Sequence, residues 1–417
     1  MEPSPMFPLN GIILFNMKRI AYIFVAILSL VSCGKTDPEE IKEDIPKQGF
    51  VPDPIDPGRF TILSWTGVNN SYADYGFRKL LEAGFNTYLG WYDNISDAEY
   101  ALSKADEVGI KMIISCPELH TDTKNVTAAF CKHPSFLAYH IEDEPEVSEF
   151  GGLAGQINNI EQYDKTHASY VNLYPNWCWG EDAYLTKIRL FAKDVPVKFI
   201  SFDNYPCKTV GGVTTVRSDW YHNLEDIRTV AKENKIPMWA FALSLSHKTN
   251  EASYPIPTIG ELRLQMFSNL VYGATGFQYF TTWGHIQNDH CTSVYQDVKK
   301  VNEELIGLEP IFLGADIKYI WHMGNKIPSG CKKISKTPDG IATLSTDDGN
   351  AVVSYLVNNG KKYIAIVNTN PNGGMNLDIS FVDNSKAVKY DKACNGTSFT
   401  PGVIRVAAGD LALYSWE

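Results

Sequence analysis

The sequence predicts an α/β protein, a (β/α)₈ TIM barrel followed by a small C-terminal antiparallel β-sandwich. Strand-like and helix-like segments alternate eight times from residue 59 onward, and regular alternation favours parallel strands with right-handed crossovers. Eight such units over about 250 residues match the size of this barrel. No glycine-rich nucleotide turn follows the first strand, which disfavours the alternative, a doubly wound open sheet.

The barrel elements are expected in strict alternation. Strands are predicted at residues 60–65, 86–91, 111–116, 136–142, 169–174, 198–203, 237–243 and 276–282. Helices are predicted at residues 75–82, 96–107, 124–132, 153–166, 184–192, 219–234, 258–272 and 297–308.

The fourth strand, within residues 136–145, ends in three consecutive acids. Alternation places the even-numbered residues from Ala138 to Glu144 on the barrel interior and the odd-numbered ones on the helix side. It therefore turns Asp143 away from the interior, unless the strand bends before Pro145. Pro145 cannot donate to a strand ladder and should end the strand. Glu144 is then at the C-terminal tip, where such barrels place their chemistry.

After about residue 311 the helical patterns stop. Short strands are predicted at residues 352–357, 362–368, 376–381 and 411–416, with turn signals at residues 358–360 and 370–374. About 100 residues of this kind predict a small antiparallel β-sandwich.

The N-terminus is predicted to be a targeting segment. A basic head at residues 17–19 precedes an apolar run at residues 20–30, which is too short to span a bilayer comfortably. Residues 30–33 resemble the bacterial lipoprotein box, which implies cleavage before Cys33, lipidation of that cysteine and a place in the cell envelope at the outer membrane or surface. Met17 is the expected start. The predicted divisions are residues 1–33 (signal peptide), 34–58 (flexible tether), 59–310 (barrel) and 311–417 (sandwich).

Composition excludes some classes of partner and ligand. The net charge is −11 and no basic stripe is present, so nucleic acid is not an expected partner. Beyond Cys33, seven scattered cysteines remain, and the sequence does not decide whether they form one or two disulfides. No C-x-x-C spacing is present, so no zinc site is predicted. His120, His140 and His247 come from different strands, so hydrogen bonding is expected of them. No metal or cofactor is predicted.

In a closed barrel the strand tips meet at one mouth, and these tips carry acids and aromatics. Cleavage of a glycosidic bond needs a protonated acid and a second carboxylate. Because the strand tips carry acids together with aromatics, we expect a carbohydrate substrate. The candidate catalytic residues are Glu144, Asp203 and Glu142. The candidate substrate-binding residues are Trp65, Trp91, His120, Asp143, Asn172, Tyr205, His247 and Trp283. Residues 177–179 would form a lip.

The chain resembles the clan A glycoside hydrolases from about residue 59 to the C-terminus. The Asp143-Glu144-Pro145 run matches the strand-four general acid of that clan, with Asp in place of the usual Asn. The eighth strand, residues 273–283, and the phrases at residues 363–368 and 409–414 are similar to its barrel and C-terminal domain. The resemblance implies a retaining glycosidase. The clan's strand-seven nucleophile is missing, however, because residues 238–247 contain no acid and Glu251 lies further on, in a loop.

Three interpretations of the site remain open at this point, two hydrolytic mechanisms and one binding function. Asp203 would serve as the second carboxylate with room for a water molecule, which predicts inversion. The Asp143–Glu144 pair would act with a substrate N-acetyl group, as in the hexosaminidases and chitinases that the pair resembles, with Tyr205 holding the acetamide. The site would otherwise bind glycans without cutting them. A lyase or esterase is disfavoured, since no G-x-S-x-G turn is present.

Overall fold

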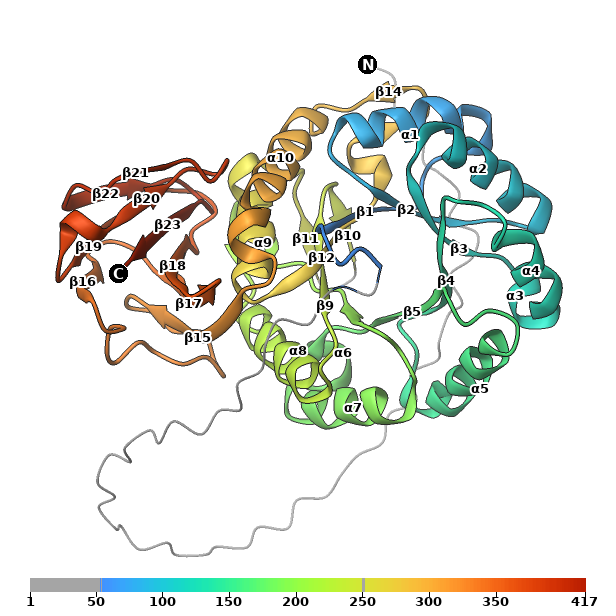
Figure 1. The fold of residues 1–417 in the computed structure, drawn as a ribbon, viewed down its shortest axis with the longest axis horizontal. Helices are drawn as coiled ribbons and strands as arrows, with labels where there is room; N and C mark the ends of the chain where they lie inside the picture. Colours follow the sequence, from blue (N-terminus) through green and yellow to red (C-terminus); the bar gives the residue numbers. More distant parts are fainter. Residues whose placement is uncertain (1–52, 54, 250–251) are drawn as a thin grey trace, which may run out of the picture. The chain divides into compact units, whose positions relative to one another are not determined.

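The computed structural model describes residue 53, residues 55–249 and residues 252–417. In this part of the chain, eight parallel strands close into a barrel in the order β1-β12-β9-β6-β5-β4-β3-β2, and helices surround it (Figure 1). The predicted fold class is therefore confirmed. The strands of the barrel are β1 (Thr61–Trp65), β2 (Thr87–Trp91), β3 (Lys111–Ser115), β4 (Phe136–Asp143), β5 (Ala168–Leu173), β6 (Ile200–Phe202), β9 (Met238–Leu243) and β12 (Ala274–Phe280).

A helix follows each strand of the barrel. The long helices are α1 (Ala73–Glu82), α2 (Ile95–Val108), α4 (Thr123–Phe130), α5 (Phe150–Glu161), α7 (Glu181–Asp194), α8 (Trp220–Asn234), α9 (Ile259–Val271) and α10 (Tyr295–Phe312). The short helices are η1 (Asn70–Tyr72), α3 (Glu118–Thr121), η2 (Val147–Glu149), α6 (Asn176–Trp179) and η3 (Thr282–Gly284).

Local sequence explains where these helices begin and end. In α2 the side chain of Asn94 accepts a hydrogen bond from the backbone N–H of Asp97, and Gly109 ends the helix in the left-handed conformation, with φ 89°. In α9 Thr258 and Glu261 form a reciprocal capping box. The helices are therefore delimited by their own residues before they pack on the barrel.

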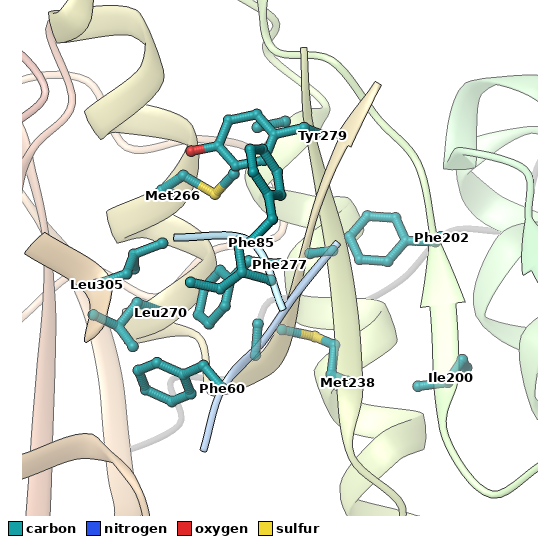
Figure 2. Close-up of a cluster of buried hydrophobic side chains, with 14 of the residues drawn as sticks. Phe60, Phe85, Ile200, Phe202, Met238, Met266, Leu270, Phe277, Tyr279 and Leu305 are labelled. Atoms are coloured by element: carbon teal, nitrogen blue, oxygen red, sulfur yellow. The ribbon is translucent and has the colours of Figure 1, made fainter. Parts of the chain in front are cut away.

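The barrel has two apolar layers. Side chains on the outer face of the strands pack against the helices, as Phe277 of β12 does near Leu270 of α9 and Leu305 of α10 (Figure 2). A smaller cluster fills the barrel interior and includes Leu63, Trp65, Leu89, Ile113, Ala138, Tyr170, Phe199, Trp239 and Phe241. Because this interior is packed, a ligand has space only at the strand ends.

Asp53 closes the N-terminal end of the barrel. Its carboxylate accepts hydrogen bonds from the indole N–H of Trp239 at 2.6 Å and from the hydroxyl of Thr275 at 2.8 Å. The Trp239 ring lies directly against Gly276 of β12, so that a Cβ built at Gly276 would lie 2.2 Å from the ring. Gly276 is therefore required by the close packing of the interior.

Gly276→Ala should destabilise the protein by about 3 kcal/mol, because the added methyl group overpacks the barrel against the Trp239 ring. Urea denaturation would measure the loss in the free energy of unfolding. Gly155→Ala is the matched control, since nothing lies within 4 Å of a Cβ built at that exposed position of α5. The control should be stabilised by up to about 1 kcal/mol. Equal stability of the Gly276 variant and the wild type would contradict this account of the interior.

Two antiparallel sheets follow the barrel. The six-stranded sheet has the order β15-β17-β18-β23-β20-β21, and the three-stranded sheet has the order β16-β19-β22. Apolar side chains of both sheets form a common core, as expected of a sandwich. Their bounds are β15 (Asp316–Met323), β16 (Ile341–Thr346), β17 (Ala351–Asn358), β18 (Lys361–Asn368), β19 (Met375–Phe381), β20 (Val388–Tyr390), β21 (Gly396–Ser398), β22 (Gly402–Val406) and β23 (Leu411–Trp416), with η4 (Asn384–Lys386) between β19 and β20.

The structure contains strands that were not predicted, most of them two to five residues long. Three hairpins were not predicted, and neither were β15, β16, β20, β21 and β22. The hairpins are β7 (Cys207–Val210) with β8 (Val213–Val216), β10 (His247–Lys248) with β11 (Ser253–Tyr254), and β13 (Ile286–Gln287) with β14 (His290–Cys291). They were missed because two to four residues show too little alternation to be recognised.

The predicted signal peptide and most of the predicted tether lie outside the described residues. Within the described ranges, no helix has the length and apolar character needed to cross a bilayer. No disulfide joins Cys116, Cys131, Cys207, Cys291, Cys331 and Cys394 to one another, so the bridges that the sequence left open do not form among these six.

Candidate active site

A β-bulge in β4 decides which acids face the barrel mouth. Along β5 the register pairs His140 with Tyr170, but Glu142 with Val171, so β4 contains one extra residue at Ile141. A bulge reverses the alternation beyond it. The expectation from alternation was therefore wrong for Glu142 and Asp143: Asp143 faces inward, opposite Asn172, and Glu142 faces outward. Glu144 lines the cavity, as expected.

Glu144 reaches the mouth through an unusual backbone conformation. Its φ is 54°, in the left-handed region that non-glycine residues adopt at a cost of order 1–2 kcal/mol. Its backbone N–H donates to the carbonyl of Asn172 at 2.9 Å, which holds the turn in place. Two successive acids, Asp143 and Glu144, consequently point into the same space. Left-handed residues held in this way are concentrated at functional sites.

A cavity of about 270 Å³ lies at the C-terminal ends of β4, β5, β6, β9 and β12. It is lined by Trp65, Asp143, Glu144, Asn172, Pro175, Trp177, Cys178, Asp203, Asn204, Tyr205, Phe241, His247, Thr249, Tyr254 and Phe280. These described lining residues include three acids but neither Lys nor Arg. The acids therefore lack a cationic partner in the wall of the cavity.

Asn172 holds two of the three acids in place. Its Nδ2 donates to Oδ1 of Asp143 and to Oδ1 of Asp203, each at 3.1 Å. Its own Oδ1 accepts a hydrogen bond from the hydroxyl of Ser201 at 2.9 Å, and Nε2 of Gln278 donates to that hydroxyl at 2.8 Å. A chain of buried polar groups thus fixes which way the Asn172 amide points and presents its donor to the carboxylates.

Glu144 and Asp203 lie close enough for a hydrogen bond between their carboxyl groups to affect the pKa of each. Such a hydrogen bond requires a proton between them, because two carboxylates repel each other. Burial, followed by the charges of Asp203 and Asp143, raises the pKa of Glu144 above its ordinary value. Burial and the charge of Asp143 likewise raise the pKa of Asp203. Burial raises the pKa of Asp143 to about 6.

Aromatic rings form a second part of the cavity lining, the aromatic wall, which consists of Tyr205, Phe241, Tyr254 and Phe280. The ring of Tyr205 lies 5.7 Å from that of Phe280 and 6.4 Å, edge-on, from that of Phe241. The β10–β11 hairpin adds Tyr254, whose ring stacks on that of His247 at 6.1 Å. Burial lowers the pKa of His247, which favours its neutral form. A ligand in this cavity would meet both carboxyl groups and apolar ring faces.

The structure brings together seven of the predicted site residues. Glu144, Asp203, Asp143, Asn172, Trp65, Tyr205 and His247 line one cavity. The predicted lip also contributes, since Trp177 and Cys178 lie in the same lining. Trp65 is almost fully buried and forms the floor, where its ring meets that of Phe241 at 5.0 Å.

Four predicted residues are not part of the cavity lining. Glu142 lies outside it because of the bulge. His120 is exposed in the short helix α3. Trp91 is 46% exposed and its indole N–H donates to Nδ1 of His140 at 3.3 Å, while Trp283 is 49% exposed in η3. These tryptophans were predicted from their places near strand ends, which do not determine the direction of a side chain.

Several lining residues were not predicted from the sequence: Pro175, Asn204, Phe241, Thr249, Tyr254 and Phe280. Alternation along β9 could have identified Phe241, because it lies two residues after the inward-facing Trp239. No sequence signal marks Tyr254, which depends on a two-residue strand. Glu251, the alternative acid near strand seven, lies outside the described residues.

Two solved structures from Bacteroides fragilis NCTC 9343 share this fold. A candidate alpha-galactosidase superposes with a TM-score of 0.52 at 10% sequence identity, over 86% of this chain and 79% of that chain. A candidate alpha-galactosidase/melibiase superposes with a TM-score of 0.51 at 11% identity, over the same fractions. At these identities the likeness shows the fold alone. The chain matches no protein-family model and no curated protein.

Proposed function

We propose that the protein hydrolyses O-glycosidic bonds of a poly- or oligosaccharide, with Glu144 as the general acid. The observation that carries this proposal is the carboxyl group of Glu144 at the tip of β4, which lines the cavity together with Asp143 and Asp203. Glycosidic cleavage needs such a group to protonate the leaving oxygen. Burial and two acidic neighbours raise the pKa of Glu144, which suits a proton donor at neutral pH.

Asp203 is too close to Glu144 to be an ordinary second carboxylate. The two catalytic carboxyl groups lie about 5–5.5 Å apart in retaining glycosidases and about 6.5–9.5 Å apart in inverting ones. Glu144 and Asp203 instead lie close enough for a hydrogen bond between their carboxyl groups. We therefore do not propose that Asp203 activates a water molecule. We assign Asp203 the role of sharing the proton of Glu144 and keeping it in place.

The arrangement favours a substrate that carries its own nucleophile. The three acids lie on β4 and just after β6, whereas the described lining from β9 and β12 is aromatic. A 2-acetamido sugar supplies the acetamide oxygen, which attacks its own anomeric carbon as Glu144 protonates the leaving group. Asp143 would then accept a hydrogen bond from the acetamide N–H. The bulge in β4 makes this role available to Asp143, because it turns the side chain into the cavity.

Glycan binding without hydrolysis is the second candidate function. The observation that favours it is the absence of an acid among the described lining residues on the β9 side. In that case the aromatic wall would hold a sugar and the carboxyl groups would bind its hydroxyls. Hydrolysis and binding are separable by experiment.

A panel of oligosaccharides tests the two candidates. We expect hydrolysis of 2-acetamido glycans to be faster by about 10²-fold or more than hydrolysis of their 2-hydroxy counterparts, because only the former provide an internal nucleophile. Release of reducing ends and direct binding would both be measured. Binding of glycans with no cleavage would support the second candidate and contradict the first.

Glu251→Gln is the accompanying control. If the substrate supplies the nucleophile, this variant should keep hydrolysis within about threefold of the wild type, since no protein carboxylate attacks the sugar. Loss of hydrolysis in Glu251→Gln, together with equal rates on 2-hydroxy sugars, would instead identify Glu251 as a nucleophile and contradict the role of the acetamide.

We further propose that the mature chain is anchored to the bacterial cell envelope through a lipidated Cys33. The order of a basic head, an apolar core and Cys33 supports this proposal. Membrane contact would be through the lipid alone. Membrane fractionation of Cys33→Ser, which should release the protein from the membrane, tests it.

A further inference from the structure

A cluster of three metal-ligating side chains lies far from the cavity, at the N-terminal end of the barrel. Cys131 follows α4, and Asp164 and His167 lie in the segment between α5 and β5. One ligand atom from each residue lies within 4.8 Å of the other two. Sγ of Cys131 is 3.1 Å from Oδ2 of Asp164 and 3.8 Å from Nδ1 of His167, and that nitrogen is 2.7 Å from Oδ2 of Asp164.

These separations are close to the edges of a zinc coordination tetrahedron. Zinc binds Cys sulfur at about 2.3 Å, His nitrogen at about 2.0–2.1 Å and carboxylate oxygen at about 2.0–2.2 Å. Tetrahedral angles then place neighbouring ligand atoms roughly 3.3–3.6 Å apart. The observed separations of 2.7, 3.1 and 3.8 Å lie on both sides of this range. Small side-chain rotations would bring all three atoms into the coordination shell of one ion.

The carboxylate of Asp164 is already oriented by the atoms around it. Its Oδ1 accepts hydrogen bonds from the backbone N–H of Thr166 at 2.9 Å and from the Thr166 hydroxyl at 2.7 Å. The hydroxyl of Tyr139 donates to Oδ2 at 2.8 Å. Such outer contacts fix a ligating carboxylate and strengthen metal binding. The oxygen that would face the ion is therefore held in position.

The imidazole of His167 and the thiol of Cys131 complete the arrangement. The ring of Phe136 packs against that of His167, with centroids 4.8 Å apart, which restricts its rotation. The side chain of Asp164 is 4% exposed and that of His167 is 22% exposed, whereas Cys131 is exposed. An ion can therefore reach the cluster from solvent.

We propose that Cys131, Asp164 and His167 bind one Zn²⁺ ion, with a water molecule in the fourth position. The thiol of Cys131 releases its proton to solvent when Zn²⁺ binds, because the thiolate is the ligand. One thiolate, one carboxylate and one neutral imidazole balance the charge of the ion. The site ties the end of α4 to the segment that precedes β5. The site lies apart from the cavity, and the proposal does not depend on the proposed hydrolysis.

Sequence spacing could not reveal such a site. The ligands are separated by 33 residues and then by three, and no C-x-x-C or H-x-x-x-H pattern links them. The scattered cysteines led us to expect no zinc site. The barrel brings the ligands together because the segments that precede β4 and β5 are adjacent, as those two strands are paired.

Metal titration of the tag-free, chelator-treated full chain tests the proposal. We expect one equivalent of Zn²⁺ to bind with micromolar or tighter affinity and to raise the Tm, since an ion that binds only the folded state stabilises it. Co²⁺ should give the near-ultraviolet charge-transfer band of a cobalt–thiolate bond. Cys131→Ser should lose that band and bind Zn²⁺ at least about 10-fold more weakly.

Two further variants make the result decisive. His167→Gln should weaken Zn²⁺ binding in the same way, and it tests the site independently if Cys131→Ser folds poorly. Cys394→Ser, which removes a cysteine of the C-terminal β region, should bind Zn²⁺ and Co²⁺ like the wild type. Absence of Zn²⁺ binding to the wild type, or unchanged binding and an unchanged cobalt band in both ligand variants, would overturn the proposal.

Discussion

Glu144→Gln is expected to lower kcat/KM for glycan hydrolysis by about 10²–10⁴-fold, the usual contribution of a general acid. Glutamine has nearly the same shape as glutamic acid, but it cannot transfer a proton to the leaving oxygen. The sugar should still bind, because the aromatic wall and the other acids are unchanged. Steady-state kinetics on a cleaved glycan and calorimetric titration with the same glycan would measure the two effects.

The same variant should be more stable than the wild type at neutral pH. Folding raises the pKa of Glu144, so the folded protein holds this proton more tightly than the unfolded chain does. The resulting stabilisation is complete below the unfolded pKa of about 4.3 and is lost as the pH rises through the folded pKa. Glutamine does not ionise, so the Tm of the variant should exceed that of the wild type increasingly as the pH rises.

Glu142→Gln is the matched control for this prediction. Glu142 lies two residues away, makes the same change of charge, and is turned outward by the bulge at Ile141. Its replacement should change kcat/KM by less than about threefold. Equal losses in both variants would indicate a general effect of charge on the barrel mouth. Full activity of Glu144→Gln would reject Glu144 as the acid.

Asp203→Asn is expected to move the alkaline limb of the pH–rate profile to lower pH, by on the order of one unit or more. In the wild type the charge of Asp203 is, after burial, the largest contribution that raises the pKa of Glu144. Asparagine removes this charge and offers an N–H donor that stabilises the ionised carboxylate. Glu144 should then lose its proton at lower pH, and a general acid without its proton is inactive.

The rate at the optimum should also fall, because Asp203 no longer shares a proton with Glu144. The acidic limb should move less, since it follows Asp143, whose pKa burial raises to about 6. Profiles of kcat/KM against pH for the wild type, Asp203→Asn and Glu142→Gln would separate these effects. An alkaline limb that is unchanged in Asp203→Asn, or that moves to higher pH, would show that Asp203 does not control the acid.

The strands and helices of the barrel were recognisable because each carries its pattern locally. All eight strands were expected within a few residues of their observed places, as β5 at Ala168–Leu173 illustrates against an expected 169–174. The two-residue strands β10 and β11 carry no such pattern, and the contribution of Tyr254 to the cavity was missed with them. Elements that depend on a partner to form cannot be read from their own residues.

The identity of the inward-facing acids depended on a single extra residue. Simple alternation correctly places Ala138 and His140 in the barrel interior, and it fails for Glu142 and Asp143 because β4 is bulged against β5. The bulge reverses the directions of Glu142 and Asp143. It is a property of two paired strands, so the sequence of β4 alone does not contain it.

By itself, the sequence determined that the chain forms a barrel of eight strand–helix units followed by a C-terminal β domain, and that acids and aromatics are concentrated at the strand ends. The periodic pattern of apolar residues is enough to recognise these strands and helices, because each element must bury one of its own faces. Only the tertiary structure decided that Asp143, Glu144 and Asp203 share one cavity with no Lys or Arg among its described lining residues, and that Cys131 lies beside Asp164 and His167. These sets join segments far apart in the chain, and their distances follow from strand register and closure of the barrel.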